Sequence, residues 1–156
     1  MLNNLKIDFE TRSREATISL AASLGARFIG GEVIELLSDL GGGKTTFAKG
    51  LVQGIGSKDI VSSPSFTISQ EYKAKDRIIH HLDFYRLQEP GIMQNELDEM
   101  IKDKSAITII EWGEIVEGIL PSERLVVRLR ATDINTRKIS IEYPTSYTYL
   151  FEESLV

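Results

Sequence analysis

The sequence contains no cysteine, which excludes a disulfide framework, a thiolate nucleophile and a metal site ligated by cysteine. No apolar run approaches the roughly 18 residues that a membrane-spanning helix requires. Residues 1–16 include no apolar segment of the kind found in secretory signal peptides. From these absences we expect a cytoplasmic protein that has no membrane partner.

An excess of positive charge is also absent. The chain has 23 acidic and 18 basic residues and a net charge of −5, so it lacks the electrostatic footprint of a protein that grips nucleic-acid phosphates by itself. The nearest approach to a basic cluster alternates along two expected strands, and we interpret it as a solvated sheet face: Arg124, Arg128, Arg130, Arg137 and Lys138. An independent nucleic-acid site is therefore not expected.

The length of 156 residues predicts one domain, residues 1–156. A chain of this length buries roughly 70% of the surface that its unfolded form exposes, so it needs no structural metal. Its patterns run from strand to loop to helix and then to further strands, without an internal repeat. This order is typical of a small α/β domain with a mixed sheet and flanking helices.

Hydrophobic spacing and turn residues place most of the elements. Ser13 can cap a helix over residues 13–26, and the apolar run at 105–112 is typical of a strand buried on both faces. The other expected elements are a strand at 32–37, a helix from 44, a loop and strand at 61–74, a strand at 76–87, a helix at 94–103 and a C-terminal antiparallel hairpin of 123–131 and 137–143. The aromatic tail, residues 147–156, can be either docked or mobile.

A glycine-rich loop between the strand at 32–37 and the next helix is the strongest chemical signal. "SDLGGGKTT" ends like a Walker A phosphate-binding loop, G-x-x-x-x-G-K-[ST]. Three successive glycines can point backbone N–H groups at an anion, Lys44 can reach the β- and γ-phosphates, and the Thr45 hydroxyl can ligate Mg²⁺. A plain turn with an exposed lysine would not require the entropic cost of three glycines. We therefore favour phosphate binding.

Ser38 stands where the Walker A pattern has its first glycine. A Cβ at this position can crowd the phosphates or demand a positive φ. Serine is small, however, and its hydroxyl can hydrogen-bond to the loop backbone. We expect nucleotide binding to survive this departure from the pattern.

Two carboxylates follow apolar strands and are candidates for the magnesium site that a P-loop enzyme needs. Glu111 follows "ITII", the arrangement of a Walker B acid. In "HHLDFYRL", a period of two puts His81, Asp83 and Tyr85 on one strand face and His80, Leu82 and Phe84 on the other. An ordinary strand-end carboxylate is the alternative for each. His81 and Asp83 as a metal pair would lack a third ligand.

Two further features of the sequence have both a functional and a purely structural interpretation. Ser62, Ser63 and Ser65 around Pro64 form a loop whose hydroxyls can respond to a γ-phosphate, as switch loops do; from this stretch alone, a serine-rich turn is favoured. Trp112 can cover a nucleobase or pack in the core. No N-K-x-D motif is present, so adenine is favoured over guanine.

Four motifs in order resemble a known family, the bacterial ATPases of tRNA threonylcarbamoyladenosine biosynthesis, also called TsaE or YjeE. The family pattern runs from G-D-L-G-A-G-K-T-T through S-P-T-F and H-x-D-x-Y-R-L to I-E-W-x-E. This chain has "SDLGGGKTT", "SPSF", "HLDFYRL" and "IEWGE". The resemblance covers most of residues 10–143 and departs at Ser38, at Gly42 in place of Ala, and at Ser65 in place of the switch-loop Thr.

The resemblance implies a P-loop NTPase fold and a set of site residues. Glu111 would be the Walker B-like acid and Asp83 a catalytic or magnesium-linked carboxylate, with Thr45 as a further magnesium ligand. Ser63, Pro64 and Ser65 would belong to the switch loop. The nucleotide would be bound by Asp39, Leu40, Gly41, Gly42, Gly43, Lys44, Thr45 and Thr46, with Trp112 beside it.

The resemblance also implies a role. Such proteins hydrolyse ATP as accessories to two partner proteins, which transfer the threonylcarbamoyl group to adenosine in tRNA, so contact with tRNA would be indirect. Two alternatives remain open from the residues. A small-molecule P-loop kinase shares the loop, although the chain is short and lacks a recognisable arginine-bearing lid. A non-hydrolysing nucleotide-binding module is the second alternative, which Ser38 makes credible.

Overall fold

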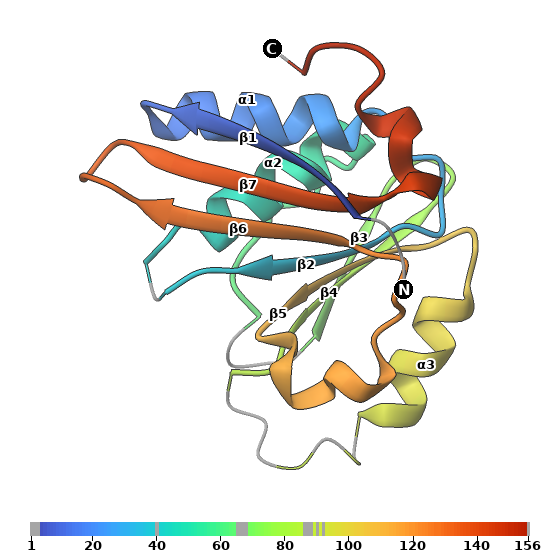
Figure 1. Ribbon diagram of the computed structural model, residues 1–156. Coiled ribbons are helices and arrows are strands. Elements are labelled where there is room, and N and C mark those ends of the chain that lie inside the picture. The colour runs from blue at the N-terminus through green and yellow to red at the C-terminus, as the bar shows by residue number, and fades with distance from the viewer. Residues whose placement is uncertain are drawn as a thin grey trace.

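A computed structural model describes residues 4–39, 41–64, 69–85, 89, 91 and 93–155. These residues form a seven-stranded sheet flanked by helices, with the strand order β1-β7-β6-β2-β5-β4-β3 (Figure 1). In chain order the elements are β1 (Asn4–Thr11), α1 (Arg14–Gly25), β2 (Val33–Leu37), α2 (Lys44–Ile55), β3 (Ser69–Lys73), β4 (Ile78–Asp83), α3 (Gln94–Lys102), β5 (Ile107–Glu111), the 3₁₀ segment η2 (Gly113–Ile119), β6 (Leu125–Ala131), β7 (Arg137–Pro144) and the 3₁₀ segment η3 (Thr145–Leu150).

The centre of the sheet is parallel and its two sides are antiparallel. Strand β2 pairs in parallel with both β5 and β6, and β5 pairs in parallel with β4. Strands β7, β1 and β3 add antiparallel pairs outside this centre. All five residues of β5 are buried, as its continuous apolar run predicts. The mixed sheet with flanking helices and a C-terminal hairpin is therefore confirmed.

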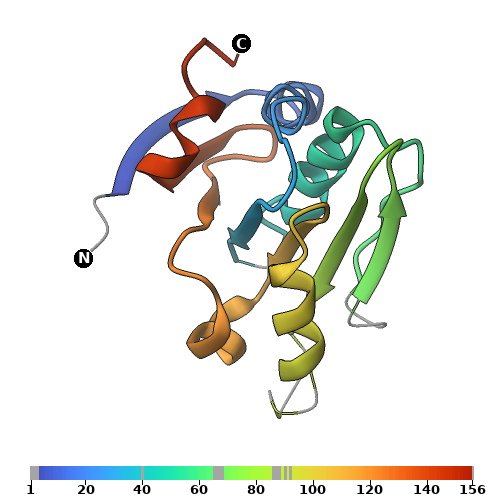
Figure 2. The ribbon, with the colours of Figure 1, turned by 90° about the vertical axis from the view of Figure 1, so that its right-hand side faces the viewer.

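Helices cover both faces of the sheet (Figure 2). Helices α1 and α2 pack on one face, where they share a hydrophobic core with alternate strand residues such as Ile34 and Ile109. Helix α3 and segment η2 pack on the other face against Val33 and Ile110. Successive side chains along each strand therefore point into two separate cores. In β5, the side chains on the same face as Ile109 point toward α2 and the glycine loop.

Close contact between the backbones of α1 and α2 depends on glycine. A Cβ built at Gly50 would lie 2.5 Å from the Ile18 carbonyl oxygen and 2.6 Å from the Ala21 Cβ. No side chain fits this space without a shift of α1. Because α2 begins at the glycine loop, this packing fixes the direction in which the N-terminus of α2 points.

Strand β1 is absent from the elements that the sequence predicts. Its residues alternate between Leu5, Ile7 and Phe9 and charged neighbours, and Ile7 and Phe9 pack against the larger core. The pattern is short, and the hydrogen bonds that stabilise it come from β7, far along the chain. This long-range pairing, rather than a local signal, makes the segment a strand.

The aromatic tail is docked on the domain. The Arg27 guanidinium donates hydrogen bonds to the carbonyl oxygens of Leu150, Glu153 and Ser154, and Leu155 is buried. The Tyr149 hydroxyl donates to a Glu32 carboxylate oxygen at 2.7 Å. Since Glu32 precedes β2 and the glycine loop follows it, the tail lies at the opposite end of β2 from that loop. None of the helices in the described ranges is long and apolar enough to cross a membrane.

Candidate functional site

The glycine loop joins β2 to α2 at the carboxyl edge of the parallel strands. Gly41 has a φ of 79° and Gly43 a φ of 105°, a region that side chains rarely adopt. Gly43 is the N-cap of α2, so the first turn of the helix follows it directly. Leu40, expected to contribute to nucleotide binding, lies outside the described residues. The loop therefore has the backbone of an anion-binding helix N-terminus.

A pocket of about 310 Å³ opens above this loop. It brings together nearly all of the predicted site residues that the structure describes. The lining residues are Ser38, Asp39, Gly41, Gly42, Gly43, Lys44, Thr45, Thr46, Ser63, Asp83, Glu111, Trp112 and Arg137. Segments distant in the sequence thus meet at one place.

Ser38 fits the loop without backbone strain. In the described part of the chain, Trp112 is the only non-glycine residue with a positive φ, so position 38 does not require glycine. The Ser38 hydroxyl donates to the Asp39 carbonyl oxygen at 2.8 Å. The expected bond between this hydroxyl and the loop backbone is thus confirmed.

The Lys44 side chain lines the pocket. Its Nζ donates to the Ser38 carbonyl oxygen at 3.2 Å and lies 4.1 Å from the centroid of the Trp112 ring. Burial lowers the pKa of Lys44, and the carboxylates of Glu111 and Asp83 oppose this effect. The Lys44 ammonium is poorly solvated, so phosphate oxygens are suited to replace its contacts with Ser38 and Trp112.

Trp112 forms one wall of the pocket in a strained conformation. Its φ of 58° and ψ of 48° are left-handed, which is uncommon for a bulky residue. The ring packs against Tyr85, with 4.9 Å between the ring centroids, and contacts the smaller core. The strained backbone turns the ring toward Lys44, so Trp112 lies on the lysine side of the pocket.

The two predicted carboxylates meet across neighbouring strands. Asp83 and Glu111 are register partners on β4 and β5, and each side chain is only 2% exposed. The Tyr85 backbone N–H donates to Asp83 at 2.9 Å. Both carboxylates line the pocket with Thr45, a set of oxygen atoms that suits Mg²⁺ held partly by phosphates.

His81 is fully buried beside Glu111. Its Nε2 lies 2.7 Å from a Glu111 carboxylate oxygen and its Nδ1 lies 3.0 Å from the Tyr72 hydroxyl. Both ring nitrogens are therefore engaged by protein atoms. Within the described ranges no group of three His, Asp or Glu side chains forms a metal cluster. His81 is placed to orient a carboxylate rather than to pair with Asp83 around a metal.

The expected switch loop reaches the pocket through Ser63. Pro64 is buried, and the Ser62 carbonyl oxygen accepts a hydrogen bond from the Tyr72 hydroxyl at 3.2 Å. Ser65 lies outside the described residues. The part of this loop that is described therefore lies between the pocket and strand β3.

Arg124 and Arg137, which the sequence assigns to a solvated sheet face, make contacts elsewhere in the fold. The Arg137 Nε donates to the Gly42 carbonyl oxygen at 3.1 Å, so the guanidinium braces the glycine loop. The Arg124 Nε contacts the Glu35 carboxylate at 3.1 Å, and the arginine is largely buried. The interpretation was wrong for both, because each arginine bonds a partner distant in the sequence. Arg137 is a site residue that the motifs missed.

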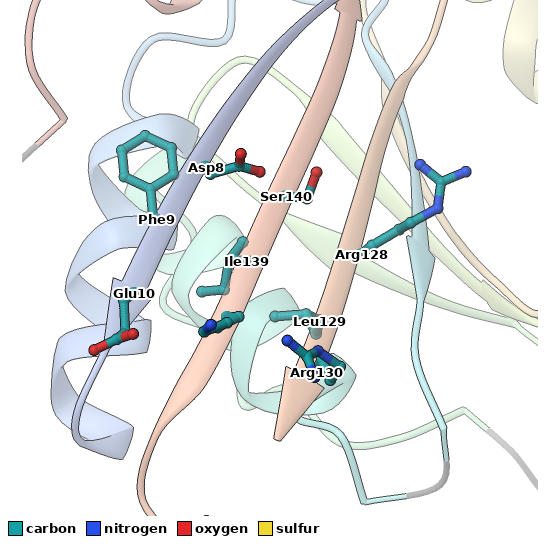
Figure 3. Close-up of a pocket in the computed structure, with 9 residues that line it drawn as sticks. Asp8, Phe9, Glu10, Arg128, Leu129, Arg130, Ile139 and Ser140 are labelled. Carbon is teal, nitrogen blue, oxygen red and sulfur yellow. The ribbon is translucent and has the colours of Figure 1, made fainter. Parts of the chain in front are cut away.

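The other three basic residues do lie on the outer face of the antiparallel strands. Figure 3 shows this face, where a hollow of about 650 Å³ is lined by acidic and basic side chains from β1, β6 and β7. Arg128 contacts Glu142 at 2.9 Å. The hollow is larger than the pocket at the glycine loop, but the mixed charge and lack of a helix N-terminus give it no preference for an anion.

Known proteins are similar to this chain in sequence and in fold. A family model described as "Threonylcarbamoyl adenosine biosynthesis protein TsaE" matches residues 11–139. The chain is 34% identical over 135 residues to the tRNA threonylcarbamoyladenosine biosynthesis protein TsaE of Bacillus subtilis (strain 168), covering 86% of this chain and 84% of the relative. It is 33% identical over 143 residues to the TsaE of Rickettsia bellii, covering 90% and 96%. The crystal structure of YdiB from Bacillus subtilis superposes with a TM-score of 0.76 at 32% identity, covering 97% of this chain and 94% of that one.

Proposed function

Since the chain belongs to the TsaE family of tRNA threonylcarbamoyladenosine biosynthesis proteins, we propose that it binds and hydrolyses ATP with Mg²⁺. The nucleotide cycle then acts as a switch on the two partner proteins that transfer the threonylcarbamoyl group. In this proposal the chain carries no group to tRNA itself, which agrees with its net charge of −5. In this proposal the protein acts with these partners in the cytosol.

One observation carries the proposal: the glycine loop, Lys44, Thr45 and two buried carboxylates line one pocket. A site that only binds phosphate needs the loop and the lysine. Asp83 and Glu111 on adjacent strands add the acidic groups that a phosphoryl-transfer site uses to hold a metal ion and position a nucleophile. Their burial at the end of parallel strands requires a counter-charge, which Lys44 supplies in part.

Each residue then has a definite task. The backbone N–H groups of Lys44, Thr45 and Thr46 lie in the first turn of α2, where intrahelical acceptors are lacking, and they bind phosphate oxygens. The Lys44 ammonium binds the β- and γ-phosphates. When bound, the magnesium ion would neutralise charge on these phosphates, held by the Thr45 hydroxyl and the Glu111 and Asp83 carboxylates.

The nucleoside has space next to this pocket. A second hollow of about 230 Å³ shares Gly43, Thr46 and Arg137 with it and extends to Arg14 and Ile134. The Ile134 side chain is 88% exposed and offers an apolar surface for a base. The base would thus lie on the α1 side of the loop, away from Trp112.

The test is phosphate release from ATP, with and without Mg²⁺, by the chain alone and with its two partner proteins. Wild type should hydrolyse ATP only with Mg²⁺, and Lys44→Ala should lower turnover by about a hundredfold, as the loss of a preorganised charge does. Lys49→Ala is the matched control, because Lys49 is an exposed lysine of the same helix. Thr45→Ala and Glu111→Gln should also remove the magnesium-dependent reaction.

The alternatives give different results in the same assay. Turnover that is unchanged in Lys44→Ala would contradict the proposed site. ATP binding without turnover, even with both partner proteins present, would indicate a non-hydrolysing module. A phosphorylated product from a panel of metabolites would instead indicate a kinase.

A further inference from the structure

A chain of buried polar contacts leads from the phosphate pocket to the loop before Pro64. It starts at the Glu111 carboxylate, one oxygen of which lies 2.7 Å from His81 Nε2. It continues from His81 Nδ1 to the Tyr72 hydroxyl at 3.0 Å, and from Tyr72 to the Ser62 carbonyl oxygen at 3.2 Å. Glu111, His81 and Tyr72 are each at most 3% exposed, so these bonds are shielded from competition by water.

The end of this chain is a loop that is fastened along the edge strand β3. The Asp59 carboxylate accepts from the Lys73 backbone N–H at 2.7 Å, and the Gln70 amide donates to the Ser62 hydroxyl at 3.1 Å. Tyr72 provides a third contact to this loop. Of these three residues of β3, Tyr72 is the one that also contacts His81. The next residue, Ser63, returns to the phosphate pocket.

Tyr72 has one hydroxyl proton for several acceptors. Within hydrogen-bond distance of its oxygen lie His81 Nδ1, the Ser62 carbonyl oxygen and the Gln70 side-chain oxygen at 3.0 Å. In the tautomer with the proton on Nε2, His81 donates to the Glu111 carboxylate and its Nδ1 is an acceptor for the Tyr72 hydroxyl. His81 and the loop therefore compete for the same proton.

We propose that Tyr72 is a positioning residue that couples the Glu111 carboxylate, through His81, to the loop ending at Ser63. A ligand that draws Glu111 toward the pocket releases the His81 ring from the bond that orients it. The Tyr72 hydroxyl then has a different acceptor available, and its hydrogen bond to the Ser62 carbonyl oxygen changes. This inference rests on the proposed function for its role, because it supplies the path by which the nucleotide site would move the loop.

The path can be tested without nucleotide by hydrogen exchange of the backbone amides at residues 57–63. Four proteins are compared: wild type, Glu111→Gln, Tyr72→Phe and the double variant. Both changes keep the size of the side chain, and thermal unfolding checks that each variant folds. Glu111→Asp, alone and together with Tyr72→Phe, is measured as well, because a glutamine oxygen can still accept from His81 Nε2 whereas aspartate withdraws the carboxylate from His81.

We expect Glu111→Asp to change the exchange rates of the loop about two- to tenfold, the effect of one net hydrogen bond, and to have no such effect in the Tyr72→Phe background. An equal effect in both backgrounds, or none in either, would overturn the inference. Tyr143→Phe is the matched control, because the Tyr143 hydroxyl has no hydrogen bond in the part of the chain that the structure describes; it should leave the loop unchanged.

Two further readouts separate positioning from general stability. The chain has two histidines, so ¹⁵N spectra can follow the His81 ring, and Tyr72→Phe should shift its Nδ1 resonance to that of a nitrogen without a hydrogen bond. In the hydrolysis assay Tyr72→Phe should lower kcat about tenfold and leave ATP affinity unchanged, and a loss confined to affinity would contradict the inference. If wild type does not hydrolyse ATP, the proposed function fails while the exchange cycle still decides the coupling.

Discussion

The Ser38 side chain occupies the space that a Cβ at position 42 would need. A Cβ built on Gly42 would lie 2.5 Å from the Ser38 Oγ and 2.6 Å from the Ser38 Cβ. These are the two loop positions at which the chain departs from the TsaE pattern, which has glycine at the first and alanine at the second. The larger residue at one position is thus accommodated by the smaller residue at the other.

This relationship predicts a strong coupling between the two positions. Gly42→Ala alone should destabilise the protein by about 1–3 kcal/mol through overpacking and weaken ATP binding. Gly42 is not among the glycines with positive φ, so alanine itself is not strained there. The double variant Ser38→Gly, Gly42→Ala should recover both properties, as measured by denaturant unfolding and calorimetry. Additive effects of the two changes would show that the clash is relieved elsewhere.

Loss of the Arg137 brace should weaken nucleotide binding. Arg137→Gln removes the hydrogen bond to the Gly42 carbonyl oxygen and a positive charge that lines the pocket. We expect ATP affinity to fall about tenfold, the size of a lost hydrogen bond from a charged donor. Calorimetric titration measures this, and Arg130→Gln on the same hairpin, an exposed position, should bind ATP like wild type. A similar loss in both variants would mean that only net charge matters.

ATP binding should weaken as the pH rises, and the decline should begin at a lower pH than it would if the binding lysine were exposed. Burial lowers the pKa of Lys44 from 10.5, so its ammonium loses the proton, and with it the attraction for phosphate, below that value. Lys44→Arg stays charged and should show no such decline. In the same range the free energy of unfolding should rise with pH, because the unfolded chain holds the lysine proton more tightly. An affinity that stays constant up to pH 10.5 would contradict the burial of this charge.

The docked tail should contribute measurably to stability. Tyr149→Phe removes a hydrogen bond to a buried carboxylate and should lower the free energy of unfolding by about 1.5–3 kcal/mol. Burial and the Glu32 carboxylate raise the pKa of Tyr149 above 10.0. This stability is therefore fully present below pH 10 and is lost as the pH rises above the ordinary tyrosine value. Urea unfolding at several pH values tests this, with Tyr143→Phe as the comparison.

The sequence predicts local features of this fold well and distant contacts poorly. The glycine loop, Lys44 and β5 carry their signals within a few residues, because turn geometry and apolar runs act locally. Strand β1 and the Arg137 brace have no such signal, since their partners lie at the other end of the chain. Tyr72 reads as an ordinary strand residue until its strand pairs with the one that carries His81.

The pairing of β1 with β7 has a consequence for synthesis. Asn4 pairs with Pro144 and Thr11 with Arg137, so among the described strands the one made first must wait for the one made last. Segments made first generally fold first, and the parallel centre can assemble while β1 has no neighbour. Arg137 opens the last strand, so the brace on the glycine loop arrives at the same moment. A nascent chain would therefore complete its phosphate pocket only when its final strand emerges.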